Sequence, residues 1–518
     1  MKFFNITGPC NPERHYMLPP AERLLDAQLN RYVNDQLFWT LHAPRQVGKT
    51  TFLLSWAREL NAGGEYAACY VTIEGCQGIE DEAKINRIIY SAICNAAEDA
   101  GFERPEPPVV VPEALFRDTL REFARRVAPK PLVILFDEVD VLEKGPMILF
   151  LRMLRGGFAT RAPGVFPVSI ALVAMHDLKD FIQQAKGEPR VNPGSPFNIK
   201  MDSATIGNFS RDDIGRLFAQ RTEETGQQIT REALDYVWEQ SQGQPWIVNS
   251  LFYRATMRVL KEDDFSTVEL AHVQKAREQI IQAQETHLDA LEYRLDDPEI
   301  RRVVTTLING EPDFDFAETD GFRLAQNLGL IARVNGEWTI ANPIYRETLA
   351  RRAVFAAEIN IPSPDNFKWR AADGSLDMDS LLKEFQEFWR ENSDVWEMKF
   401  KYTEVFPQLL LMAFLQRVTN GGGRIAREYA LGRCRLDLLV EFEGTRNIIE
   451  IKILRDYTPY EKLLASGLAQ VKKYRDSINP GIPTYLLIFD RRSPDKKTPW
   501  NERVYTRDGG NGVTVVGL

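Results

Sequence analysis

Cysteine and histidine are scarce in this sequence, whose 518 residues include five of each. The cysteines stand far apart, at positions 10, 69, 76, 94 and 434, and form no CxxC pair. A disulfide framework needs paired cysteines, and a zinc ribbon needs closely spaced cysteine or histidine ligands. We therefore expect neither kind of site.

Long apolar runs are also missing. The longest apolar stretches, residues 166–175 and 406–415, are well short of the ~20 residues that a membrane span needs. The first twenty residues are polar and rich in proline, without the apolar core of a signal peptide. With 44% hydrophobic and 26% charged residues, the composition is that of a soluble globular protein. We expect a cytoplasmic protein without a membrane partner.

The chain has no overall excess of basic residues: 64 lysines and arginines against 73 acidic residues give a net charge of −9. This excludes a protein that is basic along its whole length, such as a histone-like coat. The charge is uneven, however, because residues 399–518 contain 20 basic and 13 acidic residues. A nucleic-acid partner is therefore expected at the carboxyl-terminal part.

The pattern of apolar residues divides the chain, and the length predicts about three or four domains. Residues 36–203 alternate apolar strands with amphipathic helices, which predicts a parallel sheet covered on both faces. Residues 210–277 are helical throughout, with Ser or Thr at helix starts and Gly at helix ends. Asn335 and Gly336 between two apolar runs predict a hairpin, and with the helices before it a winged helix. Residues 361–379 have the composition of a linker.

Residues 43–50 (APRQVGKT) follow an apolar strand and precede a helix. This is the context of a phosphate-binding loop, in which backbone N–H groups and the helix amino terminus bind phosphate oxygens. Lys49 would neutralise the β- and γ-phosphates of ATP, and Thr50 would ligate Mg²⁺. Ala43 replaces the usual first glycine, and the alternative is a chance GKT at a helix start. The residues expected to bind nucleotide in this loop are Ala43, Pro44, Arg45, Gln46, Val47, Gly48, Lys49, Thr50 and Thr51.

A second motif follows at residues 132–138, where an apolar strand ends in Asp137 and Glu138. This is the Walker B pattern, in which Asp137 would hold Mg²⁺ and Glu138 would polarise the attacking water. Either motif alone could be accidental, but both in this order within one α/β segment indicate a nucleotide site. His176 follows the next apolar strand and could contact the γ-phosphate, although a structural role explains it equally well.

The segments HAPRQVGKTT, LFDEVD and SQGQPWIVNSL resemble those of prokaryotic AAA-like ATPases related to the STAND and archaeal ATPase families. The similarity covers roughly residues 1–350. It implies a helical lid whose GxP element, residues 243–245, brings Pro245 near the nucleotide. It also implies a winged helix that residues 341–347 would close.

Two expectations concern residues outside the motifs. In a homo-oligomeric ring, an arginine could reach a neighbouring subunit's nucleotide, and the alternative is a solvated basic face. The candidates for that role are Arg152, Arg155 and Arg161. The amino-terminal segment either reaches the nucleotide base or packs as a terminal arm. Its candidates are Arg14, His15 and Tyr16.

Near the carboxyl end, two apolar strands carry acidic residues and are joined by a turn. As a hairpin they place Asp437 and Glu450 on adjacent strands, with Lys452 on the same face as Glu450. Carboxylate oxygens bind Mg²⁺ or Mn²⁺, which polarises a phosphate and acidifies a water, while a lysine orients that water. The alternative is a surface ladder in which Glu450 pairs with Lys452 or Arg435.

The spacing Asp-x12-Glu-x-Lys resembles the PD-(D/E)XK nuclease superfamily, with Leu436 in place of the proline that often precedes the first acid. The resemblance implies that Asp437, Glu450 and Lys452 form a catalytic metal site. It also implies an acid on a preceding helix, at Glu404, and a Gln and an aromatic residue on a following helix, at Gln470 and Tyr474. The substrate would be nucleic acid, and DNA is favoured over RNA without the sequence deciding between them.

We therefore expect an α/β multidomain protein: a P-loop sheet of the ASCE, AAA-like type, a helical lid, a winged helix and a restriction-endonuclease-like domain. The expected boundaries are 1–205 for the ATPase, 206–285 for the lid, 286–355 for the winged helix, 356–380 for the linker and 381–518 for the nuclease. ATP binding or hydrolysis would regulate or position cleavage, in defence against foreign DNA. The alternative is a nucleotide-switched, STAND-like scaffold whose last domain binds nucleic acid without cleaving it.

Overall fold

The chain forms two compact units in the computed structural model, Met1–Asp289 with Ala317–Tyr345 and Ala290–Phe316 with Arg346–Leu518. The expected division into five segments stays a prediction. The structure describes residues 1–25, 29–108, 110, 112–142, 144–175, 202–282, 294–295, 297–308, 319–334, 336–349, 369, 371, 375–399, 410–411, 414–415, 423–431, 434–442, 444–490, 492 and 499–518.

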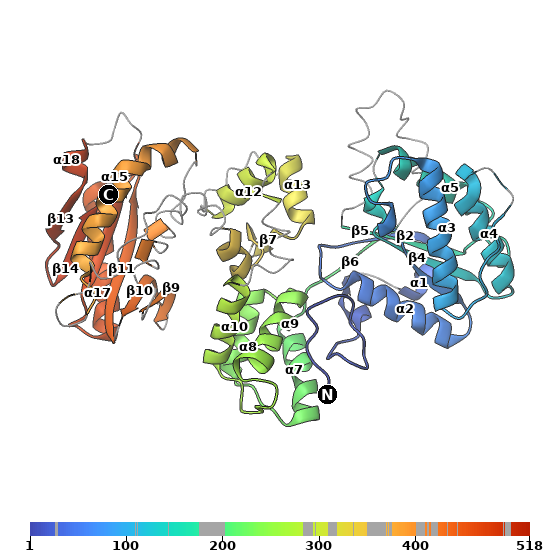
Figure 1. Ribbon diagram of the computed structural model, residues 1–518, viewed down its shortest axis with the longest axis horizontal. Coiled ribbons are helices and arrows are strands. Elements are labelled where there is room, and N and C mark those ends of the chain that lie inside the picture. Colours follow the sequence, from blue (N-terminus) through green and yellow to red (C-terminus); the bar gives the residue numbers. More distant parts are fainter. Residues whose placement is uncertain are drawn as a thin grey trace. The chain divides into compact units, whose positions relative to one another are not determined.

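A six-stranded sheet organises the first unit, with the order β1-β6-β2-β5-β4-β3 (Figure 1). Its strands are β1 (Leu24–Leu25), β2 (Phe38–His42), β3 (Ala67–Thr72), β4 (Leu132–Asp137), β5 (Ser169–Ala174) and β6 (Asp202–Ile206). All neighbours pair in parallel except β1 and β6. This is the parallel sheet that the sequence predicts for a P-loop domain.

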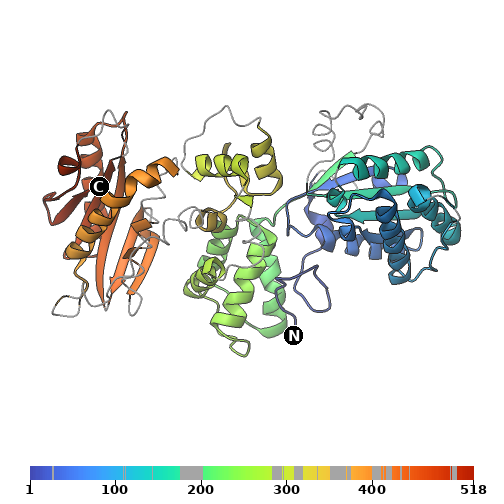
Figure 2. The ribbon, with the colours of Figure 1, turned by 45° about the horizontal axis from the view of Figure 1, so that its top comes forward.

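Helices cover both faces of this sheet, because its strands bury side chains on both sides (Figure 2). Alternate residues of one strand face opposite layers, as Phe38 and Trp39 do in β2. The layer of Phe38 contains α3 (Glu82–Asp99), α4 (Leu115–Val127) and α5 (Lys144–Phe158). The layer of Trp39 contains α1 (Leu29–Asn34) and α2 (Lys49–Gly63). The Walker motifs lie where β2 and β4 end.

The segment predicted to be a lid is helical, as expected, and its role as a lid stays a prediction. This segment, called the lid below, consists of α7 (Arg211–Thr225), α8 (Arg231–Ser241), α9 (Pro245–Arg254) and α10 (Leu270–Gln282), with a π-helical turn at Ala255–Val259. Ser210 begins α7 with a capping box, and Gly226 ends it in a left-handed conformation. The expected glycine end of α8 is wrong by one residue. Gln242 takes the left-handed C-cap position there, with a φ of 48°.

Two helices and a hairpin follow the lid. They are α12 (Pro298–Ile308), α13 (Asp320–Asn327), β7 (Ile331–Val334) and β8 (Glu337–Ile340). The hairpin is present, since Val334 pairs with Glu337, and Gly336 has a φ of 89°. Asn335 lies outside the described residues. The winged-helix assignment stays a prediction.

A second six-stranded sheet organises the carboxyl-terminal unit, with the order β13-β14-β12-β11-β10-β9. Its elements are α15 (Met378–Lys399), β9 (Gly423–Leu431), β10 (Cys434–Phe442), β11 (Thr445–Leu454), α17 (Tyr460–Ile478), β12 (Thr484–Asp490), α18 (Trp500–Arg503), β13 (Tyr505–Asp508) and β14 (Val513–Gly517). Strands β9, β10 and β11 pair antiparallel, and α17 connects β11 to the parallel strand β12. The sequence around the apolar stretch 406–415 predicts a helix over residues 402–418, most of which lie outside the described residues.

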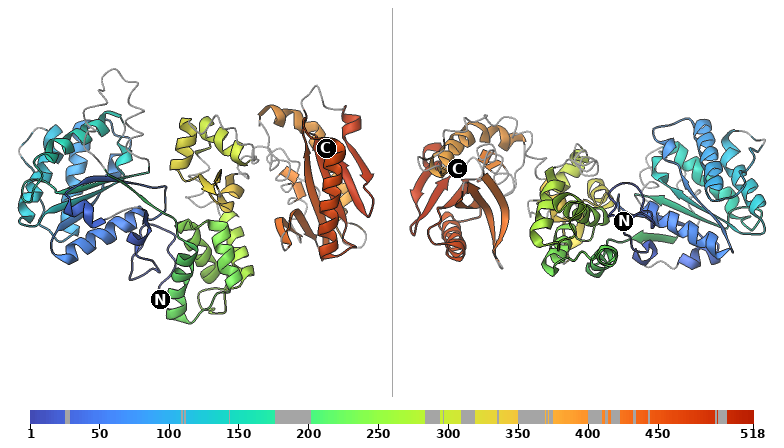
Figure 3. Two further views of the ribbon diagram at one scale, coloured as in Figure 1. Left: turned by 180° about the vertical axis from the view of Figure 1, so that it is seen from behind. Right: turned by 60° about the horizontal axis from the view of Figure 1, so that its bottom comes forward.

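Helices α15 and α17 cover opposite faces of this sheet (Figure 3). Ile488 of β12 packs in the layer of α17, whereas the next residue, Phe489, contacts Phe385 and Trp389 of α15. Gly467 allows α17 a close approach, because a Cβ there would lie 2.8 Å from a methyl carbon of Leu486. None of the described helices is both long and apolar enough for a membrane span.

Candidate functional site

The P-loop connects β2 to α2, and its conformation explains which glycine the chain keeps. Gly48 has a φ of 98°, and a Cβ at this position would lie 2.8 Å from Nη2 of Arg23. Ala43 is buried and is not among the residues with positive φ. The loop therefore requires glycine at position 48, whereas position 43 accepts a methyl group.

Lys49 begins α2 and turns its amine back onto the loop. Its Nζ donates hydrogen bonds to the carbonyl oxygens of Ala43 at 2.6 Å and Pro44 at 2.9 Å. Burial lowers the pKa of this amine to about 8, against the opposing charges of Asp137 and Asp140. An ammonium group at the amino terminus of a helix, held by a loop of backbone groups, fits the phosphates of a nucleotide.

Asp137 ends β4 beside the start of α2. Its Oδ2 accepts hydrogen bonds from the hydroxyls of Thr50 at 2.7 Å and Tyr70 at 3.2 Å, and its Oδ1 accepts from the Glu138 amide at 3.0 Å. Burial raises the pKa of Asp137, and these donors oppose that rise. A fixed carboxylate joined to a threonine hydroxyl is a donor set that suits Mg²⁺. Sequence reasoning missed Tyr70, which is 67 residues away from Asp137 in the chain.

Glu138 follows in a left-handed conformation, with a φ of 60°. Its Oε2 is buried and accepts no hydrogen bond. Burial, together with the charges of Glu74, Asp137 and Asp140, raises the pKa of Glu138 to about 7. A carboxylate with a pKa near neutrality and an unpartnered oxygen is suited to accept a proton from water.

Arg23 joins the P-loop to the segment that enters the lid, and sequence reasoning also missed it. Its buried guanidinium donates to the carbonyl oxygens of Val47 at 2.7 Å and Gly207 at 3.0 Å. The same group lies 4.8 Å from the ring centre of Phe209, whose amide donates to the Gly243 carbonyl. Burial lowers the pKa of Arg23 to about 10. One side chain thus bridges the loop and the GxP region.

The remaining predicted residues of this site have mixed outcomes. Pro245 is buried as the first residue of α9, and its proximity to nucleotide stays a prediction. His176 lies outside the described residues. The hydroxyl of Thr51 accepts a hydrogen bond from the Cys10 amide at 3.0 Å, so Thr51 anchors the amino-terminal segment.

That amino-terminal segment packs as an arm, which was one of its two interpretations. His15 is buried, stacks edge-on against Phe3, and accepts a hydrogen bond from the Asn11 amide. The Tyr16 hydroxyl donates to Glu224 of α7 at 2.5 Å. His15 and Tyr16 therefore have partners within the protein.

The arginine candidates on and after α5 differ among themselves. Arg161 donates to the carbonyl oxygens of Gln36 and Phe158, both at 2.7 Å, and stacks over the Phe158 ring. Arg152 and Arg155 are exposed on α5. The structure therefore gives Arg161 a role inside its own subunit.

The second site lies on β10, β11 and α17, where the structure brings five predicted residues together. Asp437 accepts a hydrogen bond from the Ile451 amide at 2.7 Å. The Lys452 amine donates to Glu450 at 2.8 Å and to Gln470 at 2.9 Å, and the Gln470 amide donates to the Tyr474 hydroxyl at 2.7 Å. Glu404 lies outside the described residues.

Glu450 is the most buried member of this cluster, with a side chain 1% exposed. The pair with Lys452 is therefore no surface ladder.

The Glu450 Oε2 is buried and accepts no hydrogen bond. Burial raises the pKa of Glu450, the Asp437 carboxylate raises it further, and Lys452 opposes both effects. An unpartnered carboxylate oxygen beside a second carboxylate suits a divalent cation. Within the described residues, no group of three or more His, Cys, Asp and Glu side chains is arranged to hold a metal.

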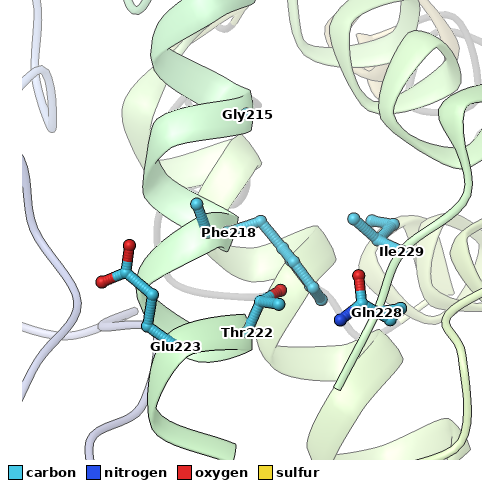
Figure 4. Close-up of a pocket in the computed structure, with 7 residues that line it drawn as sticks. Gly215, Phe218, Thr222, Glu223, Gln228 and Ile229 are labelled. Carbon is cyan, nitrogen blue, oxygen red and sulfur yellow. The ribbon is translucent and has the colours of Figure 1, made fainter. Parts of the chain in front are cut away.

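A pocket of about 330 Å³ lies on the lid, apart from both sets of residues (Figure 4). It is lined by Gly215, Phe218, Ala219, Thr222, Glu223, Gln228 and Ile229. Of these seven, Glu223 is the charged residue, and no lining residue belongs to a predicted site. We assign it no chemistry.

No family model and no curated protein sequence matches this chain. Among solved structures, a Walker-type ATPase of Pyrococcus abyssi is similar at 13% identity, over 67% of this chain and 99% of that one, with a TM-score of 0.49. Cdc6p from Pyrobaculum aerophilum is similar at 12% identity, over 64% and 91%, with a TM-score of 0.36. The RuvB Holliday junction branch migration motor of Thermotoga maritima is similar at 13% identity, over 60% and 89%, with a TM-score of 0.33.

The assignment of the first unit depends on its own geometry. A parallel sheet places Lys49 and Thr50 at the end of β2, and Asp137 and Glu138 at the end of β4. The Thr50–Asp137 hydrogen bond joins the two motifs directly. The first unit therefore has a P-loop ATPase fold.

Proposed function

We propose that this protein binds and hydrolyses ATP, and that nucleotide binding or hydrolysis regulates or positions a metal-dependent nuclease in the same chain. One structural feature, present in both sites, supports the proposal. In each, a glutamate near a lysine has a raised pKa and a buried oxygen without a hydrogen-bond partner, at Glu138 and at Glu450. A buried carboxylate oxygen without a partner lowers the stability of the fold, and groups with shifted pKa values are typical of functional sites.

In the ATPase site, the chain supplies a phosphate cradle, a metal-holding pair and a base. The loop amides and Lys49 bind the phosphates. Thr50 and Asp137 hold Mg²⁺, which neutralises phosphate charge when it is bound. Glu138 accepts the proton of the attacking water, a role that its pKa of about 7 suits at neutral pH.

In the nuclease site, Asp437 and Glu450 hold Mg²⁺ or Mn²⁺, which supplies a Lewis acid when bound. Lys452 orients the attacking water or stabilises negative charge on the scissile phosphate. Gln470 holds the Lys452 amine from α17, and Tyr474 in turn holds Gln470. Glu404 keeps its expected role as a further acid.

Nucleic acid is the proposed substrate, because the carboxyl-terminal part is basic. DNA is the first candidate and RNA the second. Exposed Lys472 and Lys473 lie on the same helix as Gln470. Positive charge beside a metal site favours binding of a phosphate backbone. The expected lid, winged-helix and linker boundaries, and a role in defence against foreign DNA, belong to the same proposal.

Plasmid cleavage tests the nuclease half. The full chain is incubated with plasmid and Mg²⁺ or Mn²⁺, with and without ATP, beside the Lys452→Ala variant. Cleavage by the wild type and its loss in Lys452→Ala are expected. If the wild type cleaves under no condition, the scaffold alternative replaces the nuclease, and a retained plasmid shift on a gel would then identify nucleic-acid binding.

Nucleotide titration tests the ATPase half. Lys49→Ala is expected to abolish ATP and ADP binding, measured by calorimetry, because its amine is the main positive charge of the loop. Lys452→Ala serves as the matched control and should bind both nucleotides as the wild type does. Equal affinity in wild type and Lys49→Ala would contradict a P-loop nucleotide site.

A further inference from the structure

Arg45 is one of the P-loop residues expected to bind nucleotide, but its guanidinium has no assigned contact. It is exposed in the loop between β2 and α2. Its Nε donates to the sulfur of Met175 at 3.1 Å, and Met175 directly follows β5. The Met175 amide in turn donates to Asp140, which fixes this end of β5 near Walker B. The Arg45 side chain therefore extends from the P-loop to the end of β5, which lies between β2 and β4 in the sheet.

The position of Arg45 brings its guanidinium to the edge of the sheet that carries both motifs. Arg45 lies four residues before Lys49, and its side chain reaches the residue that directly follows β5. Strand β5 pairs with β4, which ends in Asp137 of Walker B.

The hydrogen-bond partner of Arg45 is a weak one. A thioether sulfur is a poor acceptor, and within the described residues Arg45 forms no ion pair with a carboxylate. Arg161, by contrast, is committed to two backbone carbonyls. Arg45 therefore keeps most of its donors for an anion that enters the loop.

We propose that Arg45 is a catalytic residue in cis, whose guanidinium contacts the γ-phosphate oxygens and stabilises their charge during hydrolysis. This inference depends on the proposed ATPase function. A bond forms between the water oxygen and the γ-phosphorus, and the bond to the bridging oxygen breaks with its electron pair passing to ADP. The water proton goes to Glu138, and Arg45 neutralises the charge on the transferring oxygens.

The test compares two ligands on the full chain. Calorimetry measures the affinity for Mg²⁺–ADP and for Mg²⁺–ADP with aluminium fluoride, a mimic of the transferring phosphoryl group, in wild type, Arg45→Ala and Arg45→Lys. We expect Arg45→Ala to bind ADP within about twofold of the wild type but to lose about 10²–10³-fold in affinity for the mimic, a substantial share of the effect of an arginine finger. Arg45→Lys should recover part of that loss.

Arg58→Ala is the matched control, because Arg58 is an exposed arginine on α2 without a predicted role. It should match the wild type with both ligands. Turnover per chain should not depend on protein concentration, as a residue acting in cis requires. The inference is overturned if Arg45→Ala keeps its affinity for the mimic, or if it loses affinity for ADP and the mimic equally. Absence of ATP turnover in the wild type would instead overturn the proposed ATPase.

Discussion

The two candidate sites place similar groups in the protein by different means. In the P-loop, the Lys49 amine is held by two backbone carbonyls. On β11, the Lys452 amine is held by the side chains of Glu450 and Gln470. A site built on backbone depends on loop conformation and tolerates changes of side chain. A site built on side chains depends on residue identity at each position.

The same difference separates the two glutamates. Glu138 is near other acidic groups and Arg45, but its raised pKa has no direct ion pair to oppose it. The Lys452 amine lies 2.8 Å from the Glu450 carboxylate. The pKa of Glu450 is still raised, because burial and the Asp437 charge outweigh this ion pair. At the second site a bound divalent cation would therefore favour the charged form of Glu450.

The largest expected effect is on ATP turnover. Glu138→Gln removes the proposed base while keeping its size, so we expect ATP hydrolysis to fall by about 10²–10⁴-fold. Nucleotide affinity should be kept, so that the variant traps ATP. Phosphate release and filter binding of ATP measure the two quantities, with Glu59→Gln, at an exposed position on α2, as the control. Normal turnover in Glu138→Gln would show that another group is the base.

Cleavage by the second site should respond much more to Lys452 than to the exposed lysines of this region. We expect Lys452→Ala to reduce plasmid cleavage by about 10²–10³-fold, the effect of removing one donor that stabilises transition-state charge. Lys472→Ala, which removes an exposed lysine from α17, should change cleavage only slightly. A similar loss in both variants would mean that general positive charge, and not the side-chain site, is responsible.

Glycine substitutions probe the dependence of the first site on backbone. Gly48→Ala should weaken ADP binding by about tenfold or more, because a left-handed alanine costs roughly 1–2 kcal/mol and its Cβ would meet Arg23. Ala43→Gly should leave the affinity within about twofold. Calorimetry decides between them, and equal effects at both positions would contradict the loop geometry described above.

Tyr70→Phe removes one hydrogen bond from Asp137 and leaves the strand intact. We expect the Mg²⁺ concentration for half-maximal ATPase activity to rise about tenfold, which corresponds to about 1.4 kcal/mol. The turnover at saturating Mg²⁺ should change little. Tyr66→Phe, on the residue just before β3, is the control. An unchanged Mg²⁺ dependence would limit Tyr70 to packing.

The smallest effect concerns stability and pH at the second site. Because the pKa of Glu450 is raised, the folded state binds more protons than the unfolded state as pH rises above the ordinary glutamate range. Stability contributed by the neutral form is therefore lost as pH rises toward the folded pKa. Without metal, Glu450→Gln should melt about 2–4 °C above the wild type at pH 8, the shift that roughly 1 kcal/mol produces in a domain of this size.

The difference should shrink at pH 5, where Glu450 is neutral in the folded protein. Adding Mn²⁺ at pH 8 should raise the melting temperature of the wild type more than that of Glu450→Gln. A variant that melts below the wild type at pH 8 without metal would show that the ion pair with Lys452 outweighs the burial of Glu450.

Local sequence was sufficient for the elements that carry the motifs. The apolar run before Asp137 and the GKT after β2 indicated both strand ends, because each signal spans only a few neighbouring residues. The hairpin of β10 and β11 followed from alternation of apolar and charged residues. Helix ends were less predictable: α8 has Gln242 in its left-handed C-cap position, one residue before the expected glycine.

The residues that sequence reasoning missed act across long separations. Arg23 reaches Gly207, 184 positions later, and Tyr70 reaches Asp137. No local pattern marks either residue, since arginine after a turn and tyrosine in a strand are ordinary. Only the order of strands in the sheet brings β3 beside β4, and only the return of β6 brings Gly207 to the loop.

The close contact of α17 with β12 has a consequence for the second site. Because Gly467 has no side chain, the helix lies directly on Leu486, and a Cβ at position 467 would also lie 3.4 Å from Cγ of Lys452. One turn further along, Gln470 is then near enough to hold the Lys452 amine. The distance between the helix and the sheet thus decides whether Gln470 can reach the Lys452 amine. The absence of a Cβ at Gly467 is what permits that distance.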